Sequence, residues 1–168
     1  KRVTENTPLT PISTYNKTKM IAEKVLMSYR NKMKIHCIRP GTVSGYSGKM
    51  RLDLTVNILT FRALKNKKIT VFGGKQVRPN INIKDLINVF CFFLKNKKIE
   101  EGPYNAGFEN MSVINIAKKV ARKIPSKIII KKIIDPRNYY QDSSKLLKLG
   151  FKPKYNINDS IDEDRKST

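Results

Sequence analysis

Tyr15 and Lys19 stand four residues apart in the segment STYNKTKMIAEKVL, whose apolar residues recur at helical spacing. Side chains four residues apart lie on one face of a helix, one turn from each other. A phenol in this position can act as a general acid or base, and a neighbouring ammonium favours its ionised form. In a lysine-rich chain the same spacing also arises in exposed pairs without a function, so the pair alone leaves both interpretations open.

Tyr15 could act as a base near neutral pH only if its phenolate were strongly stabilised. A free tyrosine has a pKa of about 10, so reactivity near neutral pH requires stabilisation of the phenolate by roughly 4 kcal/mol. An ammonium at about 4 Å supplies only about 1 kcal/mol in water, but about 4 kcal/mol at an effective dielectric constant of about 20. We therefore expect Tyr15 and Lys19 to function only beneath a bound group, such as a cofactor, that excludes water.

A glycine-containing segment, IRPGTVSGYSG, follows an expected strand and carries Gly41, Gly45 and Gly48. A phosphate-binding loop of the dinucleotide type would open a helix and be followed about 20 residues later by an acidic residue. The residues KMRLD follow here instead. We interpret the segment as a strand end at the rim of an α/β sheet, where ligands bind in open sheets, with a plain glycine-rich turn as the alternative.

Two arginines, Arg78 and Arg137, stand out against a background of lysines. The planar guanidinium suits phosphate oxygens, which it binds through two parallel hydrogen bonds. Taken singly, each residue is explained equally well as a surface side chain or an ion-pair partner.

The elements that must position these residues follow from periodicity and from turn signals. The tyrosine-bearing helix is expected over 14–30, and the tail 158–168, which is acidic, is expected to fray. A helix over 52–65 should bury the face that carries Leu54, Ile58, Phe61 and Leu64. The remaining strands are expected at 34–39, 68–74, 78–83, 103–107 and 126–134, and the remaining helices at 84–96, 112–124 and 143–151. Helices and strands alternate, which predicts an α/β fold.

The composition sets limits on size and partners. The chain has 168 residues, the size of one ordinary domain, and 39% of them are hydrophobic, enough for a packed core. The formal charge of +22 suggests a basic nucleic-acid-binding module. The sequence carries no helix-turn-helix, zinc-finger or RNP signature, and its lysines fall on expected helix backs and turns. We keep nucleic-acid binding as the less favoured hypothesis.

Cysteine and histidine usage predicts a reducing compartment and no metal site. Cys37 and Cys91 lie in apolar segments and are expected to be buried free thiols, and the single histidine, His36, is expected to be structural. No apolar run reaches the length that crosses a bilayer. These features predict a cytoplasmic protein without a membrane partner.

Five motifs in order resemble those of the extended short-chain dehydrogenase/reductases, and within them the NAD-dependent nucleotide-sugar epimerases and dehydratases. They are TPLTPISTYNKTKMIAEKVL, IHCIRPGTVSGYSG, KITVFGGKQVRPNINIKDLINVF, GPYNAG and DPRNYYQDSSKLLKLGF. The resemblance implies the C-terminal part of a Rossmann-like doubly wound sheet joined to a small α/β substrate-binding domain. Residues 1–50 would be a remnant of the dinucleotide-binding domain and 51–168 mainly the substrate domain, with a segment around 78–100 packing back on the Rossmann part.

The resemblance also implies roles for individual residues. Tyr15 would be the general acid/base on a sugar hydroxyl, and Lys19 would hold the nicotinamide ribose and lower the pKa of Tyr15. Pro40 and Gly41 would line the nicotinamide. The substrate, a nucleotide-diphosphate sugar, would contact Thr42, Arg51, Asn57, Arg78 and Arg137, the last two gripping the diphosphate. The reaction would transfer hydride from a sugar carbon to NAD, or NADP, and back.

Departures from the family pattern leave the sugar and the reaction subtype open. Thr42 stands where many members carry asparagine, and Pro79, Asn82 and Lys84 replace an acid, a histidine and an acid, although Asp85 is retained. Members also begin with a glycine-rich nucleotide-binding turn that this sequence lacks. We expect the C-terminal portion of an enzyme of surface-polysaccharide sugar synthesis, inactive alone and able to form a homodimer through the tyrosine helix. A non-catalytic relative is a third hypothesis.

Overall fold

The computed structural model describes residues 2–133, 135 and 138–166 of the chain. The helices of this part are α1 Thr14–Ser28, α2 Thr55–Asn66, α3 Ile83–Lys95, α4 Val113–Lys123, α5 Ser144–Lys148 and α6 Ile157–Lys166. The strands are β1 Arg2–Val3, β2 His36–Pro40, β3 Thr42–Ser44, β4 Lys68–Phe72, β5 Val77–Asn82, β6 Gly102–Ala106, β7 Glu109–Ser112, β8 Lys127–Lys131 and β9 Tyr140–Gln141.

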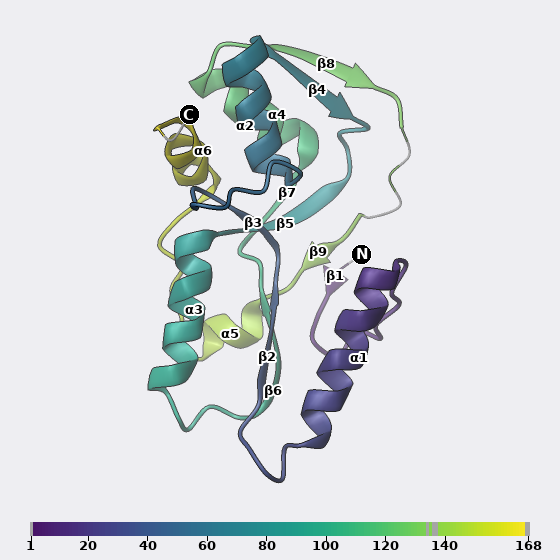
Figure 1. The fold of residues 1–168 in the computed structure, drawn as a ribbon, viewed down its shortest axis with the longest axis vertical. Helices are drawn as coiled ribbons and strands as arrows, with labels where there is room; N and C mark the ends of the chain where they lie inside the picture. The colour runs from purple at the N-terminus through teal and green to yellow at the C-terminus, as the bar shows by residue number, and fades with distance from the viewer. Residues whose placement is uncertain (1, 134, 136–137, 167–168) are drawn as a thin grey trace.

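The strands form small, mostly parallel sheets. Strands β2 and β6 pair in parallel, as do β4 with β8 and β1 with β9. A three-stranded sheet, in the order β3-β5-β7, lies between the two ends of the molecule, and its β5–β7 pair is antiparallel. In Figure 1, α2, α4 and α6 lie with β4 and β8 at one end, while α1, α3 and α5 lie with β2 and β6 at the other. The predicted α/β class is confirmed.

The first hydrophobic core lies where α2, α4 and α6 pack together against β4. Helix α2 turns a different face inward from the predicted one: its buried residues include Val56, Leu59 and Ala63, whereas Ile58 and Leu64 are only partly buried. The apolar pattern misled because α2 also buries Thr60, whose hydroxyl donates to the Val56 carbonyl at 2.9 Å. The cluster consists of Val56, Leu59, Ala63, Ile69, Val71, Val113, Ile116, Ala117, Val120, Ile124, Ile157 and Ile161.

The acidic tail does not fray but forms α6, so that prediction was wrong. Ile157 and Ile161 are one turn apart and both are buried in the first core. The Glu109 carboxylate accepts a hydrogen bond from the Ile157 backbone N–H and so satisfies one of the free donors at the start of the helix. Two apolar residues at helical spacing were sufficient for this packing. The acidic residues around them made the segment resemble a disordered tail in the sequence.

The second core lies between α3, β2, β6 and α5. Asn82 caps α3 by accepting a hydrogen bond from the Lys84 backbone N–H at 2.8 Å. His36 packs on Phe93, with 4.8 Å between the ring centres, which agrees with a structural role. The cluster contains Ile81, Val89, Phe93, Ile99, Tyr104, Ala106, Leu146 and Phe151.

Helix α3 also corrects the prediction for the cysteines. Its residues are apolar nearly all round, yet only one face packs on the core. Cys91 is therefore exposed, and Cys37 on β2 is half-buried. Burial raises the pKa of the Cys37 thiol. Apolar neighbours in the sequence were a poor guide to burial on a helix with two apolar faces.

Helix α1 lies beside β2 and buries none of its side chains (Figure 1). Its link to the body is an ion pair in which Glu23 receives two hydrogen bonds from Arg39 of β2, at 2.5 and 2.9 Å. The apolar residues Ile21, Val25 and Leu26 of the helix are exposed. No helix within the described ranges is long and apolar enough to cross a membrane.

Candidate functional site

Tyr15 and Lys19 share one face of α1, as the sequence predicts. Ser13 caps the helix by accepting a hydrogen bond from the Asn16 backbone N–H at 3.2 Å, which starts the helix just before the tyrosine. The Lys19 ammonium lies 5.5 Å from the centre of the Tyr15 ring. The tyrosine is 66% exposed. The pair therefore shares one helix face but lies in a high dielectric, where the attraction between a phenolate and an ammonium is weak.

Arg51 and Asp53 form an exposed pair near this tyrosine. The guanidinium donates to both carboxylate oxygens, at 2.6 and 3.1 Å, in the two-pronged geometry that arginine favours. The hydrogen bond to Asp53 raises the pKa of Arg51, and the same bond lowers the pKa of Asp53. The Tyr15 phenol makes a smaller contribution to the raised pKa of Arg51.

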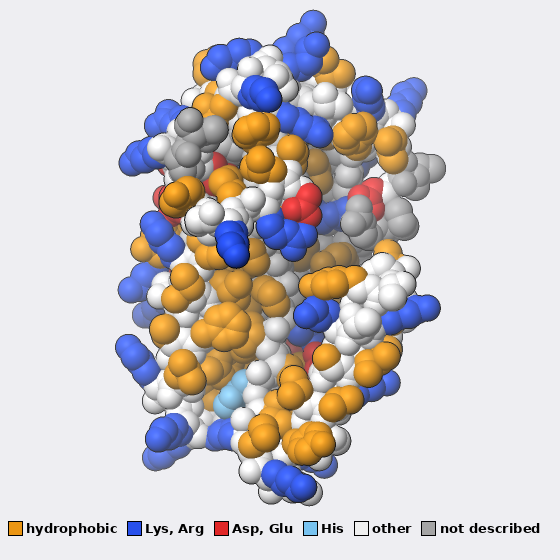
Figure 2. All heavy atoms as spheres, in the orientation of Figure 1, with side chains coloured by type: hydrophobic (Ala, Val, Ile, Leu, Met, Phe, Trp, Pro, Cys, Tyr) orange, Lys and Arg blue, Asp and Glu red, His pale blue; other side chains and the backbone are white. Residues whose placement is uncertain are grey.

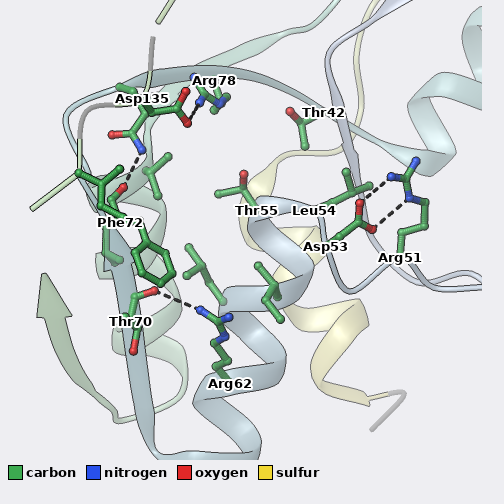
Figure 3. Close-up of a pocket in the computed structure, with 16 residues that line it drawn as sticks. Thr42, Arg51, Asp53, Leu54, Thr55, Arg62, Thr70, Phe72, Arg78 and Asp135 are labelled. Carbon is green, nitrogen blue, oxygen red and sulfur yellow. Dashed lines mark hydrogen bonds and ion pairs between the residues drawn. The ribbon is translucent and has the colours of Figure 1, made fainter. Parts of the chain in front are cut away.

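A pocket of about 670 Å³ extends from this pair along α2 to β4 and β5 (Figure 3). Three residues predicted to bind substrate, Thr42, Arg51 and Arg78, line it together. Because β3, the loop before α2 and β5 each contribute one of them, residues far apart in the sequence meet only through the fold. The complete lining is Thr42, Arg51, Asp53, Leu54, Thr55, Ile58, Leu59, Arg62, Thr70, Val71, Phe72, Gln76, Arg78, Val113, Ile133 and Asp135.

Arg78 is held in the pocket wall by Asp135. The two side chains form an ion pair of 2.6 Å and are only 11% and 17% exposed. A second guanidinium nitrogen of Arg78 donates to the Val77 carbonyl at 3.1 Å. Pro79 keeps the backbone at Arg78 extended, which is the conformation of β5. Arg137, the other predicted phosphate ligand, lies outside the described residues.

The other predicted ligands do not line this pocket. Asn57 is buried, and its amide donates to the Arg51 carbonyl at 3.1 Å, so it supports the loop that carries Arg51. Pro40 and Gly41 lie at the end of β2, where the Gly41 N–H donates to the Ala106 carbonyl at 2.9 Å. A Cβ atom on Gly41 would lie 2.9 Å from the Pro79 backbone, so only glycine allows this close approach. Their contacts with cofactor or substrate stay predictions.

Sequence reasoning missed several residues of the pocket. Asp53 stands two positions from Arg51, so the sequence alone could have predicted that the two side chains pair. Arg62 lies eight residues after Leu54 and four after Ile58, so helical spacing could have placed it beside them. Asp135 is 57 residues from Arg78 and carried no local signal for their pairing.

Charge is dispersed on the face of the molecule that Figure 2 draws. Figure 2 shows lysine and arginine side chains scattered around the outline of this face, whose centre is largely hydrophobic. The described residues contain no cluster of His, Cys, Asp or Glu that could hold a metal ion.

Parallel strand pairs flanked by helices, with a pocket where several strands end, define an α/β protein of the Rossmann-like class. Residues 1–107 match the model of the NAD dependent epimerase/dehydratase family, and the chain belongs to this family. A curated relative, a UDP-glucose 4-epimerase of Lactobacillus helveticus, is 33% identical over 95% of this chain and 56% of its own.

Solved structures agree with the family assignment. The UDP-glucuronic acid 4-epimerase of Bacillus cereus in complex with NAD superposes with a TM-score of 0.84 at 26% identity, over 99% of this chain and 57% of that one. The dTDP-glucose 4,6-dehydratase of Bacillus anthracis in complex with NAD has the same fold, with a TM-score of 0.83 at 21% identity over 99% and 56% of the two chains. The chain thus spans little more than half the length of these proteins.

Proposed function

We propose that this chain forms the nucleotide-sugar-binding portion of an NAD-dependent epimerase or dehydratase, with Tyr15 as the general acid/base. The observation that carries the proposal is the pocket between α2, β4 and β5, which Arg51, Arg62 and Arg78 line together. The family membership and the named substrates of the relatives, UDP-glucose and UDP-glucuronic acid, support the same substrate class.

Arg78 is suited to the diphosphate of such a substrate. A guanidinium has five N–H donors. Hydrogen bonds to Val77 and Asp135 use two of those of Arg78, which leaves donors for phosphate oxygens. Because Asp135 fixes the guanidinium before any ligand arrives, binding would cost little side-chain ordering.

Tyr15 and Lys19 are suited to proton transfer beside a nicotinamide. NAD, when bound, supplies reversible two-electron oxidation of a sugar carbon. In this proposal the Lys19 ammonium stabilises the Tyr15 phenolate, and the phenolate oxygen takes the proton of the sugar hydroxyl and becomes a neutral phenol. Both side chains are exposed on one face of α1, which leaves them accessible to such a ring, and burial beneath it would strengthen their attraction about fourfold.

The proposal extends to the organisation of the whole enzyme. Residues 1–50 would belong to the dinucleotide-binding domain and 51–168 mainly to the substrate domain, with NAD bound largely by residues outside these 168. The exposed apolar residues Ile21, Val25 and Leu26 of α1 are consistent with a homodimer through this helix. A cytoplasmic role in surface-polysaccharide sugar synthesis follows from the family resemblance alone.

Calorimetric titration of this chain with UDP-glucose and with NAD tests the binding part of the proposal. We expect UDP-glucose to bind, Arg78→Ala to weaken binding at least tenfold because a charged hydrogen-bond donor is lost, and NAD to bind weakly. Arg122→Ala, an exposed arginine on α4, is the matched control and should change nothing. Equal binding by Arg78→Ala and the parent would contradict the proposal, as would tight NAD binding by this chain alone.

The catalytic role requires a dinucleotide-binding half, which the Bacillus cereus epimerase can supply as an N-terminal fusion. Tyr15→Phe keeps the ring but removes the acidic oxygen, so turnover by the fusion should fall by at least a hundredfold while UDP-glucose binding persists. Equal turnover of Tyr15→Phe and its active parent would exclude Tyr15 from the mechanism. A correctly folded, nucleotide-binding fusion without turnover would favour a non-catalytic relative.

A further inference from the structure

The helix that carries Tyr15 is anchored to the body of the chain by the ion pair between Glu23 and Arg39. The guanidinium donates from Nε and from a terminal nitrogen to the two oxygens of Glu23, at 2.9 and 2.5 Å, and its other terminal nitrogen donates to the Glu5 carbonyl at 3.1 Å. The side chains of Glu23 and Arg39 are only 20% and 19% exposed. Because two parallel hydrogen bonds fix both distance and orientation, this contact can hold α1 in one position although the helix buries none of its side chains.

The two faces of β2 show where the anchor lies. Successive side chains of a strand point to opposite faces. His36 and Ile38 pack toward the second core. Cys37 and Arg39 therefore point to the other face, and the bond from Arg39 to Glu23 places α1 over it.

The ion pair also sets the height of Tyr15 along β2. Tyr15, Lys19 and Glu23 follow one another at steps of four residues and form one stripe of α1. Figure 1 shows α1 and β2 running in opposite directions, so Tyr15 lies toward the C-terminal end of the strand. Eight residues of helix rise about 12 Å, the length of about four residues of strand. Counted from Arg39, that length extends past the end of β2 to Thr42, which lines the pocket.

We propose that Glu23 is a positioning residue, whose ion pair with Arg39 fixes the rotation and height of α1 and so holds Tyr15 and Lys19 at the pocket. Proton transfer depends steeply on the placement of the acid or base, so a small roll of the helix would be enough to slow it. This inference rests on the proposed function, because it gives Glu23 a task only if Tyr15 is the general acid/base.

Cys37 is a native reporter of whether α1 stays in place. The sequence has two cysteines, so in a Cys91→Ser background Cys37 is the single thiol, on the face of β2 that α1 covers. Burial raises the pKa of this thiol, the charge of Glu23 raises it further, and Arg39 lowers it. Alkylation by iodoacetamide, followed by mass spectrometry between about pH 6.5 and pH 10.5, gives both the pKa and the rate constant of the thiolate itself. A change of charge alone shifts the pKa, whereas displacement of α1 raises the rate constant.

We expect Glu23→Ala to raise the thiolate rate constant at least fivefold. Glu23→Gln keeps the length of the side chain and one acceptor oxygen, so it should lie between the alanine variant and the parent. Arg39→Met should resemble Glu23→Ala, and the double variant should be no faster than either single one if the two side chains act as a pair. Lys24→Ala changes an exposed neighbour on α1 and should leave the rate constant as in the parent.

Turnover of the fusion with the dinucleotide-binding half of the Bacillus cereus epimerase tests the functional consequence. Glu23→Ala should lower kcat at least tenfold and leave the KM for UDP-glucose within about twofold, because the pocket residues are unchanged. Glu23→Gln should recover part of the loss. Circular dichroism at the assay temperature verifies that each variant is folded, since a loss of stability alone would lower kcat only by the unfolded fraction.

The outcomes separate this inference from the proposed function. An unchanged thiolate rate constant in Glu23→Ala would overturn the inference, and so would faster alkylation with an unchanged kcat in an active fusion. Additive effects of Glu23→Ala and Arg39→Met would overturn the pairing on which it depends. Equal turnover of Tyr15→Phe and its active parent contradicts the proposed function instead, and the alkylation rates then still decide whether Glu23 holds α1 in place.

Discussion

Asp85 offers the sharpest test of how the fold is held together. It lies in the first turn of α3 and is completely buried. Its two carboxylate oxygens accept hydrogen bonds from the backbone N–H of Lys154, at 3.1 and 3.0 Å, and one of them also accepts from Tyr155 at 2.9 Å. The side chain therefore ties the start of α3 to the segment that joins α5 to α6.

The cost of removing this carboxylate can be worked out from its partners. In Asp85→Ala two backbone N–H groups lose their acceptor, and each buried unsatisfied donor costs about 1–3 kcal/mol. Loss of a negative charge from the first turn of a helix adds about 0.5 kcal/mol. We expect a total loss of about 4 kcal/mol, a large part of the roughly 5–15 kcal/mol that stabilises an ordinary domain.

Urea denaturation followed by far-UV circular dichroism measures this loss directly. Asp85→Asn is the matched variant, because it keeps one acceptor oxygen in place, and we expect it to lose about half as much stability as Asp85→Ala. A loss below about 1 kcal/mol in the alanine variant would refute the reasoning, because the backbone donors would then have found other partners. Equal losses in both variants would show that the charge, and not the acceptor geometry, is decisive.

Two further predictions concern α6. Burial raises the pKa of Asp164 to about 7, with a smaller contribution from Glu163, so the folded state holds a proton that the unfolded state releases. Stability should therefore fall as pH rises from about 4 to about 7, by up to about 4 kcal/mol, and Asp164→Asn should remove that part of the dependence in urea titrations at pH 5 and pH 8. Ile161→Ala should cost about 2–5 kcal/mol in the same assay, because its side chain is completely buried and leaves a cavity.

Each of these predictions has an internal control. Glu100→Gln, on an exposed loop, should leave the pH dependence of the parent unchanged. A parent whose stability is flat between pH 5 and pH 8 would contradict the raised pKa of Asp164. Leu94→Ala removes a side chain that is 77% exposed and should change stability by less than about 0.5 kcal/mol. Similar losses for Ile161→Ala and Leu94→Ala would mean that α6 does not pack as described.

Local patterns in the sequence were sufficient to predict most helices and strands and the placement of some candidate site residues. Helical spacing and a serine cap were sufficient to place Tyr15 and Lys19 on one face of a helix, because both signals act within a single turn. Alternation of strands and helices was sufficient for the fold class. Thr42, Arg51 and Arg78 line one pocket, and their contacts with a substrate stay a prediction.

Features that depend on long-range pairing could not be predicted in this way. Ser44, Asn82 and Ser160 are all buried, and hydrogen bonds of 2.9 Å join both Ser44 and Asn82 to the Ser160 hydroxyl. In a sequence, polar residues of this kind are expected at the surface. Their burial could not be predicted, because Ser160 is 78 residues from Asn82 and 116 residues from Ser44. The helix α6 was missed for the same reason, since its packing surface combines Ile157 and Ile161 with buried Ser160.

The many surface lysines and the few arginines of the pocket should contribute differently to the binding of an anion. Most lysines are exposed, where a flexible ammonium is screened and must be ordered before it can bind anything. Arg78 is instead fixed by the mostly buried Asp135, and Arg51 is oriented more loosely by its exposed pair with Asp53, and both line the pocket. Each side chain that need not be ordered saves about 0.5–1.5 kcal/mol on binding. Discrimination for a compact dianion such as a diphosphate should therefore come from these few fixed guanidiniums, and the net charge of +22 should contribute mainly salt-sensitive attraction at long range.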